Sequence, residues 1–433
     1  MRASTSRAVL ALTLAAGLAA TLPAVAADAA AAPASTASQP DNFVRPAFAA
    51  AFNAAQDALK NGNGTAALAK LKELDAIPDL SPYEKYMQLR LRAPAEYSIN
   101  DNTAAAADYD AILANRMLPA EDRVAMLKAL AGIYYGSEQY PKAAVAMQRY
   151  FDAGGNDPQL KELLPQAQYA AKDYANAAKG FRAEVDAAYA AGKVPTEKLL
   201  RLEYSAYVGL KDDAGVVSAM EHLAVNYPKP DYWHDLIPRV REVDNFSERL
   251  VLDYYRLKAQ VFGQVDDRER LNYAAIAARA GYPGEAKKVL EAAAAGKPFT
   301  GNDLADANRL RPEVTRAAAA DAAQQSANET AARNAKDGNA LVSQGLLEAV
   351  TDNAAKGAQL IEAGIAKGSL KQPGDAQLHL GYAQLRAGRD ADAMKTFQSV
   401  KGPNGLTELA RLWVMYLQSK QAPAAAPMAA ASR

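Results

Sequence analysis

The sequence predicts an all-α protein made of short antiparallel helices, and three observations support this fold class. Alanine is the commonest residue and occurs in runs at 104–107 and 292–295, and alanine is the strongest helix former. Segments that alternate Val, Ile and Thr with polar residues are scarce, so there is little sign of β-strands. Proline, glycine or Asn-Gly interrupts the apolar segments about every dozen residues, which is typical of short helices joined by turns.

The N-terminal segment has the three parts of an export signal. Arg2 and Arg7 precede an apolar stretch at 8–20, and Ala24-Val25-Ala26 follows as a small-x-small cleavage site. We therefore expect residues 1–26 to be a signal peptide, cleaved near Ala26, and the mature chain to be periplasmic without stable membrane insertion. The alternative is an uncleaved anchor, since the uncharged stretch is nearly long enough to span a bilayer.

Charge and cysteine usage exclude several classes of partner and site. The 49 basic residues balance 49 acidic ones, so no electrostatic field favours nucleic acid or an anionic lipid surface. The absence of cysteine excludes disulfides, thiolate zinc sites, a cysteine nucleophile and a lipoprotein anchor on cysteine. We expect no cofactor.

The helical segments repeat with a regular small residue. In the best unit, Leu380-Gly381 is followed by Ala393 and Phe397, and the small residue lets two helices approach while the aromatic ring fills the space beside them. The equivalent small residues elsewhere are Ala67, Ala105, Ala143, Ala177, Val216 and Ala286. They are 38, 38, 34, 39 and 70 residues apart, the last interval being two units of about 35 residues.

On these residues the chain resembles the tetratricopeptide repeat family, in its exported bacterial form, over residues 43–420. The resemblance implies an α-solenoid of helical hairpins, wound as a right-handed superhelix. One hairpin cannot bury both of its faces, so neighbouring hairpins must stack.

Composition divides the chain further. Residues 27–42 and 421–433 lack periodicity and are expected to be a flexible lead-in and a disordered tail. No large apolar side chain occurs between Val314 and Leu341. Residues 311–338 are therefore expected to form a polar connecting helix or hinge. It would join an N-terminal array at 43–310 to C-terminal hairpins at 339–420.

No catalytic constellation is present, so we expect that the protein is not an enzyme. The sequence lacks Ser-x-x-Lys, Gly-x-Ser-x-Gly, Gly-Lys-Ser/Thr and His-Glu-x-x-His. Its three histidines, His222, His234 and His379, lack the spacing of metal ligands. A structural role is the better interpretation for each, and no metal site is expected.

The resemblance implies a binding groove lined by the first helix of each hairpin. The residues it places there are Lys128, Tyr135, Glu162, Gln166, Tyr169, Lys198, Arg201, Ser205, Tyr382 and Arg386. Tyrosine and basic side chains suit an extended peptide or a flexible protein segment. Gly132 and Ser205 stand where the family's carboxylate clamp has asparagine, so the sequence departs from that clamp. Alternatively, the tyrosines pack between hairpins.

A second candidate surface is the aromatic segment at 229–263. We expect Tyr232, Trp233, Arg239, Tyr255 and Arg256 to contribute to partner binding, because aromatic residues and arginine are concentrated at binding hot spots. Packing in an irregular part of the array is the alternative, favoured for Trp233, whereas a surface role is favoured for the arginines.

The function that these features favour is a periplasmic scaffold that holds an envelope protein along its groove. Assembly, secretion or TonB-type energy-transducing systems are the partners that the resemblance implies. The alternative is an accessory module that presents peptidoglycan to a separate hydrolase.

Overall fold

The computed structural model describes residues 43–263, 266–295 and 299–421, and the predicted signal peptide and lead-in lie outside them, as does nearly all of the tail. The described residues form 20 α-helices, two short 3-10 helices and no strand, which confirms the all-α prediction. The α-helices are α1(Pro46–Lys60), α2(Gly64–Leu74), α3(Pro82–Ser98), α4(Asn102–Ala114), α5(Ala120–Gly136), α6(Tyr140–Asp152), α7(Pro158–Ala170), α8(Tyr174–Ala190), α9(Glu197–Leu210), α10(Asp213–Asn226), α11(Pro230–Leu236), α12(Val251–Phe262), α13(Asp267–Arg279), α14(Pro283–Ala295), α15(Gly301–Asn334), α16(Asn339–Thr351), α17(Ala354–Lys367), α18(Pro373–Arg386), α19(Asp390–Ser399) and α20(Leu406–Gln421). The 3-10 helices are η1(Pro238–Glu242) and η2(Glu248–Leu250).

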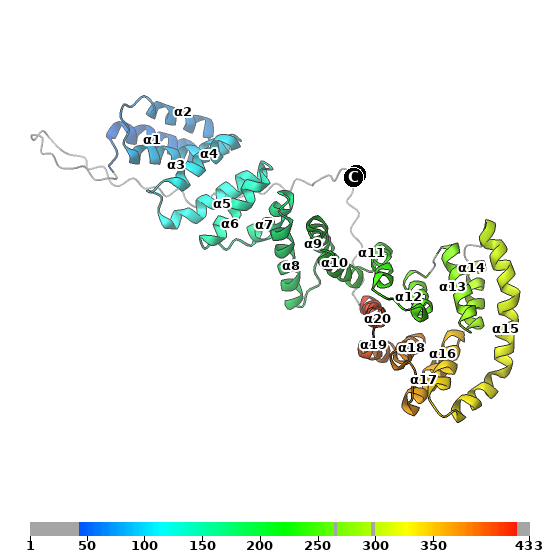
Figure 1. Ribbon diagram of the computed structural model, residues 1–433. Coiled ribbons are helices and arrows are strands. Elements are labelled where there is room, and N and C mark those ends of the chain that lie inside the picture. Colours follow the sequence, from blue (N-terminus) through cyan, green and yellow to red (C-terminus); the bar gives the residue numbers. More distant parts are fainter. Residues whose placement is uncertain (1–42, 264–265, 296–298, 422–433) are drawn as a thin grey trace, which may run out of the picture. The chain divides into compact units, whose positions relative to one another are not determined.

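The chain divides into two compact units, which meet between Asp213 and Ala214. Unit 1 contains α1 to α9, and unit 2 contains α10 to α20 (Figure 1). In unit 1 every helix packs on the next one along the chain, and α1 also contacts α3. This nearest-neighbour packing is what a stack of helical hairpins requires.

The hairpin turns share one geometry. Each contains a residue with positive φ, and the next residue donates its N–H to the carbonyl five positions before it, as from Gln139 to Tyr134 at 2.9 Å. This is the hydrogen bond of a Schellman motif, which ends a helix. In seven of these turns the positive-φ residue is Gly62, Asn100, Glu138, Lys172, Lys211, Gly281 or Gly388. The predicted small residues, together with Ala393, lie five residues after these, and all are buried.

The packing role predicted for Gly381 and Phe397 is confirmed in unit 2. A Cβ atom built on Gly381 would lie 2.6 Å from the Phe397 ring, closer than real side chains approach. Phe397 is 1% exposed and stacks on Trp413, with ring centroids 5.5 Å apart. The glycine therefore allows α18 and α19 to approach through an aromatic layer that continues into α20.

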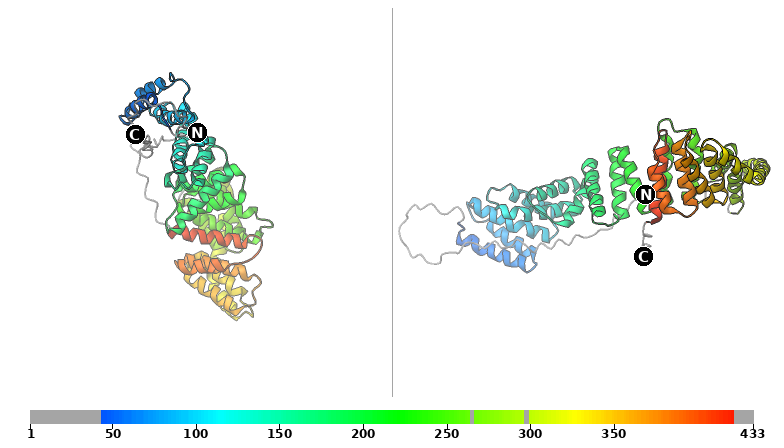
Figure 2. Two further views of the ribbon diagram at one scale, coloured as in Figure 1. Left: turned by 90° about the vertical axis from the view of Figure 1, so that its left-hand side faces the viewer. Right: turned by 90° about the horizontal axis from the view of Figure 1, so that it is seen from below.

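The last helices of unit 2 return to α12. α20 contacts α12 as well as α18 and α19, as Figure 1 and Figure 2 show for the red helix beside the green ones. Gln260 of α12 donates to the Tyr416 hydroxyl at 2.9 Å, and Arg249 forms a two-pronged ion pair with Asp375 at 2.6 and 3.0 Å. Contacts across more than a hundred residues of sequence thus join the two ends of this unit.

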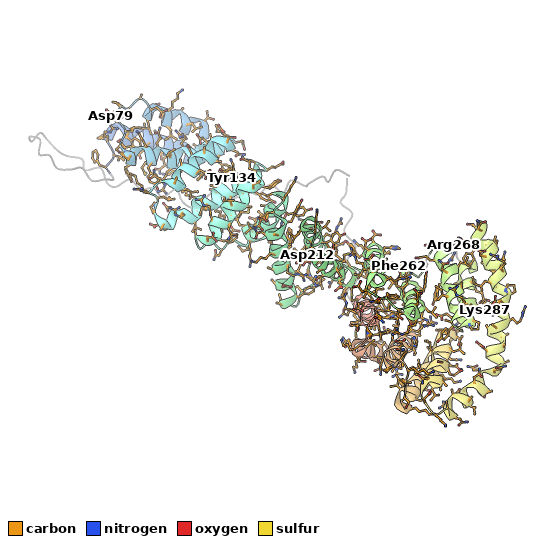
Figure 3. All side chains as sticks on the ribbon, in the orientation of Figure 1. Asp79, Tyr134, Asp212, Phe262, Arg268 and Lys287 are labelled. Carbon is orange, nitrogen blue, oxygen red and sulfur yellow. The ribbon has the colours of Figure 1, made fainter. Side chains whose placement is uncertain are left out.

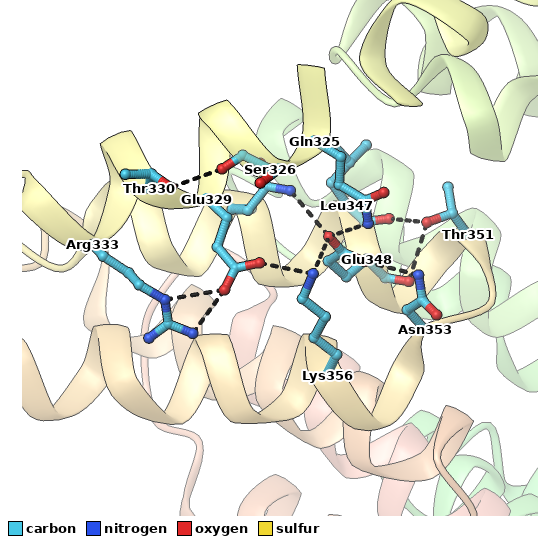
Figure 4. A network of polar contacts seen from close by, with 11 residues as sticks. Gln325, Ser326, Glu329, Thr330, Arg333, Leu347, Glu348, Thr351, Asn353 and Lys356 are labelled. Atoms are coloured by element: carbon cyan, nitrogen blue, oxygen red, sulfur yellow. Dashed lines mark hydrogen bonds and ion pairs between the residues drawn. The ribbon is translucent and has the colours of Figure 1, made fainter. Parts of the chain in front are cut away.

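The alanine-rich segment at 311–338 belongs mostly to α15, one continuous helix that packs on α13, α14 and α16. Polar contacts hold this helix against its neighbours. Gln325 donates to the buried Glu348 carboxylate of α16 at 2.5 Å, and Glu329 pairs with Lys356 of α17 at 2.7 Å (Figure 4). The compact units divide after Asp213, whereas composition predicts a boundary between two arrays at residues 311–338.

Candidate partner-binding surface

The aromatic segment at 229–263 is largely a packing region. Trp233 and Tyr255 are buried, at 2% and 8% exposure. Tyr232 and Arg239 are half-buried. Phe262, labelled in Figure 3, stacks on the exposed His234 ring with centroids 4.3 Å apart. The packing alternative therefore describes Trp233 and Tyr255 better than a surface position.

The expected surface position of Arg256 is wrong. Its guanidinium is 1% exposed, bonds both oxygens of Glu285 at 2.9 and 2.7 Å, and donates to Asp253 at 2.7 Å. It also lies 5.6 Å from the Tyr382 ring, which is buried too, so Tyr382 does not line a surface. Arginine is seldom fully buried, but two carboxylates compensate the loss of its hydration here.

Two further groups complete this buried cluster. The Tyr273 hydroxyl donates to Glu285 at 2.7 Å, and the His379 Nε2 lies 3.2 Å from Asp253. Burial opposes ionisation of Asp253, but the neighbouring His379 and Arg256 outweigh it and lower the pKa of that carboxyl to about 2. The cluster joins α12, α13, α14 and α18, and a structural role for His379 agrees with its place in it.

Unit 1 presents the predicted groove residues on the first helices of its hairpins. Lys128, Glu162 and Arg201 each lie ten residues before the positive-φ residue of their turn, and Arg90 occupies the same position in α3. We call this side of α3, α5, α7 and α9 the first-helix face. Glu162 and Arg201 are exposed, as is Lys198.

Two cations of the first-helix face are already ion-paired. Lys128 contacts Asp157 at 2.5 Å, and Asp157 caps the N-terminus of α7. Arg90 contacts Asp122, in the first turn of α5, at 2.7 Å. Each pair joins one hairpin to the next, so these cations have a packing role beside any role in binding.

The groove tyrosines also have packing partners. Tyr135 meets Tyr140 edge to face, and Tyr169 meets Tyr174 in the same way, each with ring centroids 5.6 Å apart. Tyr140 and Tyr174 begin the second helix of their hairpins, so each pair closes a turn. Tyr135 and Tyr169 are half-buried, and each also packs against a hydrophobic core cluster.

The remaining predicted groove residues differ in their contacts. Gln166 and Ser205 are half-buried and donate to carbonyls of their own helix turns, Glu162 and Arg201 respectively, at 2.9 and 2.8 Å. In unit 2, Arg386 is exposed at the end of α18.

The first-helix face contains a pocket of about 480 Å³ that the sequence did not indicate. α3 and the loop before α5 supply its lining, which is Pro82, Tyr83, Tyr86, Met87, Arg90, Met117 and Pro119. Arg90 lies 5.7 Å from the Tyr86 ring centroid. Met117 is 39% exposed at the rim. The sequence held one signal for Arg90: it occupies the same repeat position as Lys128 and Arg201, ten residues before the positive-φ residue of its turn.

Among the described residues, no three His, Asp or Glu side chains cluster as metal ligands would. Within the same part of the chain, no helix combines the length and apolar character needed to cross a bilayer.

No family model matches the chain, and no curated protein matches it. Two solved structures are similar in part. One is Naa15/Naa10 bound to HypK-THB, with 12% identity and a TM-score of 0.26 over 84% of this chain and 70% of that one. The other is yeast Tom70, with 11% identity and a TM-score of 0.19 over 86% of this chain and 96% of that one.

Proposed function

We propose that the protein is a non-catalytic interaction scaffold of the cell envelope that holds an extended segment of a partner protein along the first-helix face of unit 1. The observation that carries the proposal is the placement of Arg201, which is exposed, and Tyr135, which is half-buried, at repeat positions of two first helices. A pocket beside Arg90, at the position of α3 equivalent to Arg201, adds to it. Concave, mostly apolar sites with a few polar groups are typical of ligand binding.

The composition of the face supports a peptide ligand. Half-exposed tyrosines offer a large apolar area with a polar edge, and exposed Lys198 and Arg201 supply donors without a deep cavity. Periplasmic localisation rests on the signal-peptide pattern at 1–26. An assembly, secretion or TonB-type system is the proposed context for the partner.

Site-specific photo-crosslinking in living cells tests this proposal. A photoreactive residue at Tyr135 or Arg201 should give one defined protein adduct, whereas the same residue at Val145 should not. Val145 is 60% exposed and lies on α6, a second helix, so it serves as a matched control. Equal crosslinking at all three positions would contradict the proposal. Sedimentation of the chain with purified peptidoglycan, without a protein adduct, would favour the accessory-module alternative.

A further inference from the structure

We infer that the pocket between α3 and α5 binds an uncharged apolar side chain of an extended peptide, and that the Tyr86 hydroxyl donates a hydrogen bond to an acceptor beside that side chain. The inference rests on the proposed function and specifies what the partner must present. Three properties of the pocket support it: its lining, its charge and its buried hydroxyl.

The lining favours an apolar occupant. Pro82, Met87, Met117 and Pro119 provide aliphatic walls, and the rings of Tyr83 and Tyr86 and the Arg90 side chain complete the lining. A volume of about 480 Å³ is within the range of small-molecule sites and is sufficient for one leucine- or phenylalanine-sized side chain with its backbone. Methionine is unbranched and polarizable, so Met87 and Met117 can adapt to different apolar shapes.

The charge of the pocket favours an uncharged occupant. Arg90 is the only charged residue of the lining; its side chain is 14% exposed, and its guanidinium pairs with Asp122 at 2.7 Å. An anionic ligand would have to displace this carboxylate, and a cationic ligand would meet the guanidinium. Neither sign of charge is therefore favoured at the pocket.

The buried hydroxyl indicates a missing acceptor. Tyr86 is 2% exposed, and its hydroxyl has no hydrogen-bond partner within the part of the chain that the structure describes. Burial raises the pKa of this phenol although the Arg90 guanidinium beside it opposes the rise, so the group stays neutral. Buried polar groups without partners are rare and costly. A peptide carbonyl entering with the apolar side chain would satisfy the donor.

Small uncharged probes test the inference on the full chain. We expect N-acetyl-leucine amide and N-acetyl-phenylalanine amide to bind, by saturation-transfer NMR and titration, at least about tenfold more tightly than N-acetyl-alanine amide. The reason is the apolar area that the larger side chains bury. N-acetyl-aspartate amide should bind no better than the alanine probe.

Two variants separate the contributions of the pocket. Met117→Ala removes an exposed rim side chain and should weaken the leucine probe severalfold at unchanged melting temperature. Tyr86→Phe deletes only the hydroxyl and should weaken it about three- to tenfold, while stability stays equal or rises because a buried unpaired group is lost. Val145→Ala, an exposed apolar truncation on α6, should change neither affinity nor stability.

The result that would overturn the inference is an unchanged probe affinity in Met117→Ala and Tyr86→Phe. It is also overturned if the aspartate probe binds best and Asp122→Asn strengthens it, since that result would assign Arg90 to an anionic ligand. Failure of the probes with continued crosslinking at Tyr135 and Arg201 would reject this pocket and leave the proposed function standing. Probe binding without any partner adduct on unit 1 would support the apolar pocket and reject the proposed function.

Discussion

Units 1 and 2 contain similar helical hairpins, but an arginine and a tyrosine from each unit differ sharply in burial. In unit 1, Arg201 is exposed and Tyr135 half-exposed on the first helices. In unit 2, Arg256 and Tyr382 are buried against each other, with Glu285 and Asp253 around the guanidinium. The named arginine and tyrosine therefore reach solvent in unit 1 and are enclosed in unit 2.

The difference depends on contacts that are distant in sequence. His379 and Asp375 of α18 reach Asp253 and Arg249 across 126 residues, so the C-terminal helices cover the aromatic segment. In unit 1 each helix packs on its neighbours along the chain, and Lys198 and Arg201 of α9 stay exposed. Residue type alone cannot distinguish these cases, because coverage by a distant helix is a tertiary property.

The largest expected effect contrasts two arginines. Arg256→Ala should destabilise the protein by about 3–5 kcal/mol, because it leaves the carboxylates of Asp253 and Glu285 buried without their cation. Arg201→Ala removes an exposed side chain and should change stability by less than about 0.5 kcal/mol. Urea unfolding followed by circular dichroism measures both. Similar changes for the two variants would show that the burial contrast between the units is wrong.

Glu96 of unit 1 is a half-buried carboxyl group whose pKa is raised, in contrast to Asp253 of unit 2, whose pKa is lowered. Burial, with Asp108 nearby, raises the pKa of Glu96 to about 7 although Arg92 opposes the rise. The folded protein then binds this proton more tightly than the unfolded chain, so stability should fall as pH rises from about 4.5 to 7. Glu96→Gln removes that decline.

At pH 8 the Glu96→Gln variant should be more stable than the parent by on the order of 1–2 kcal/mol, a value reduced for partial exposure of the site. At pH 4 the two should be nearly equal. Glu121→Gln, at an exposed position of α5, is the control and should follow the parent throughout. A parallel decline in Glu96→Gln and the parent would contradict the raised pKa.

Replacing one glycine in each unit by alanine compares how closely the helices pack there. Gly381→Ala places a methyl group 2.6 Å from the Phe397 ring and should cost about 1–3 kcal/mol through overpacking. Gly136→Ala meets nothing within 4 Å at the end of α5 and should stabilise by about 0.5–1 kcal/mol. Thermal unfolding should therefore shift in opposite directions. Shifts of the same sign would disprove the close approach of α18 and α19.

The smallest expected effect concerns the shared turn. Glu138 of unit 1 has φ of 59° at the position where Gly388 of unit 2 has 75°. Glu138→Gly should stabilise by about 0.5–1 kcal/mol, because glycine adopts the left-handed conformation without strain. Gly388→Glu should destabilise by a similar amount. If neither substitution alters the unfolding midpoint, the turn geometry is not a shared determinant of the hairpins.

The sequence predicted the hairpins well because their determinants are local. Ala143 and Ala177 lie five residues after a turn, and such spacings can be counted along the chain. The burial of Arg256 could not be predicted, since its partner Glu285 is on another hairpin and His379 is far along the chain. The pocket was missed for the same reason: Met117 reaches α3 from a loop that carries no repeat signal.

The affinity of the crosslinked partner for the exposed cations of α9 tests the central claim most directly. Lys198→Glu with Arg201→Glu reverses two charges on the first-helix face. Lys172→Glu with Lys179→Glu makes the same change at exposed positions in the turn between α7 and α8 and on α8. Calorimetric titration with the purified partner should show about tenfold weaker binding for the first pair at unchanged melting temperature, and parental affinity for the second. Equal affinities for both pairs and the parent would contradict a partner site on the first-helix face of unit 1.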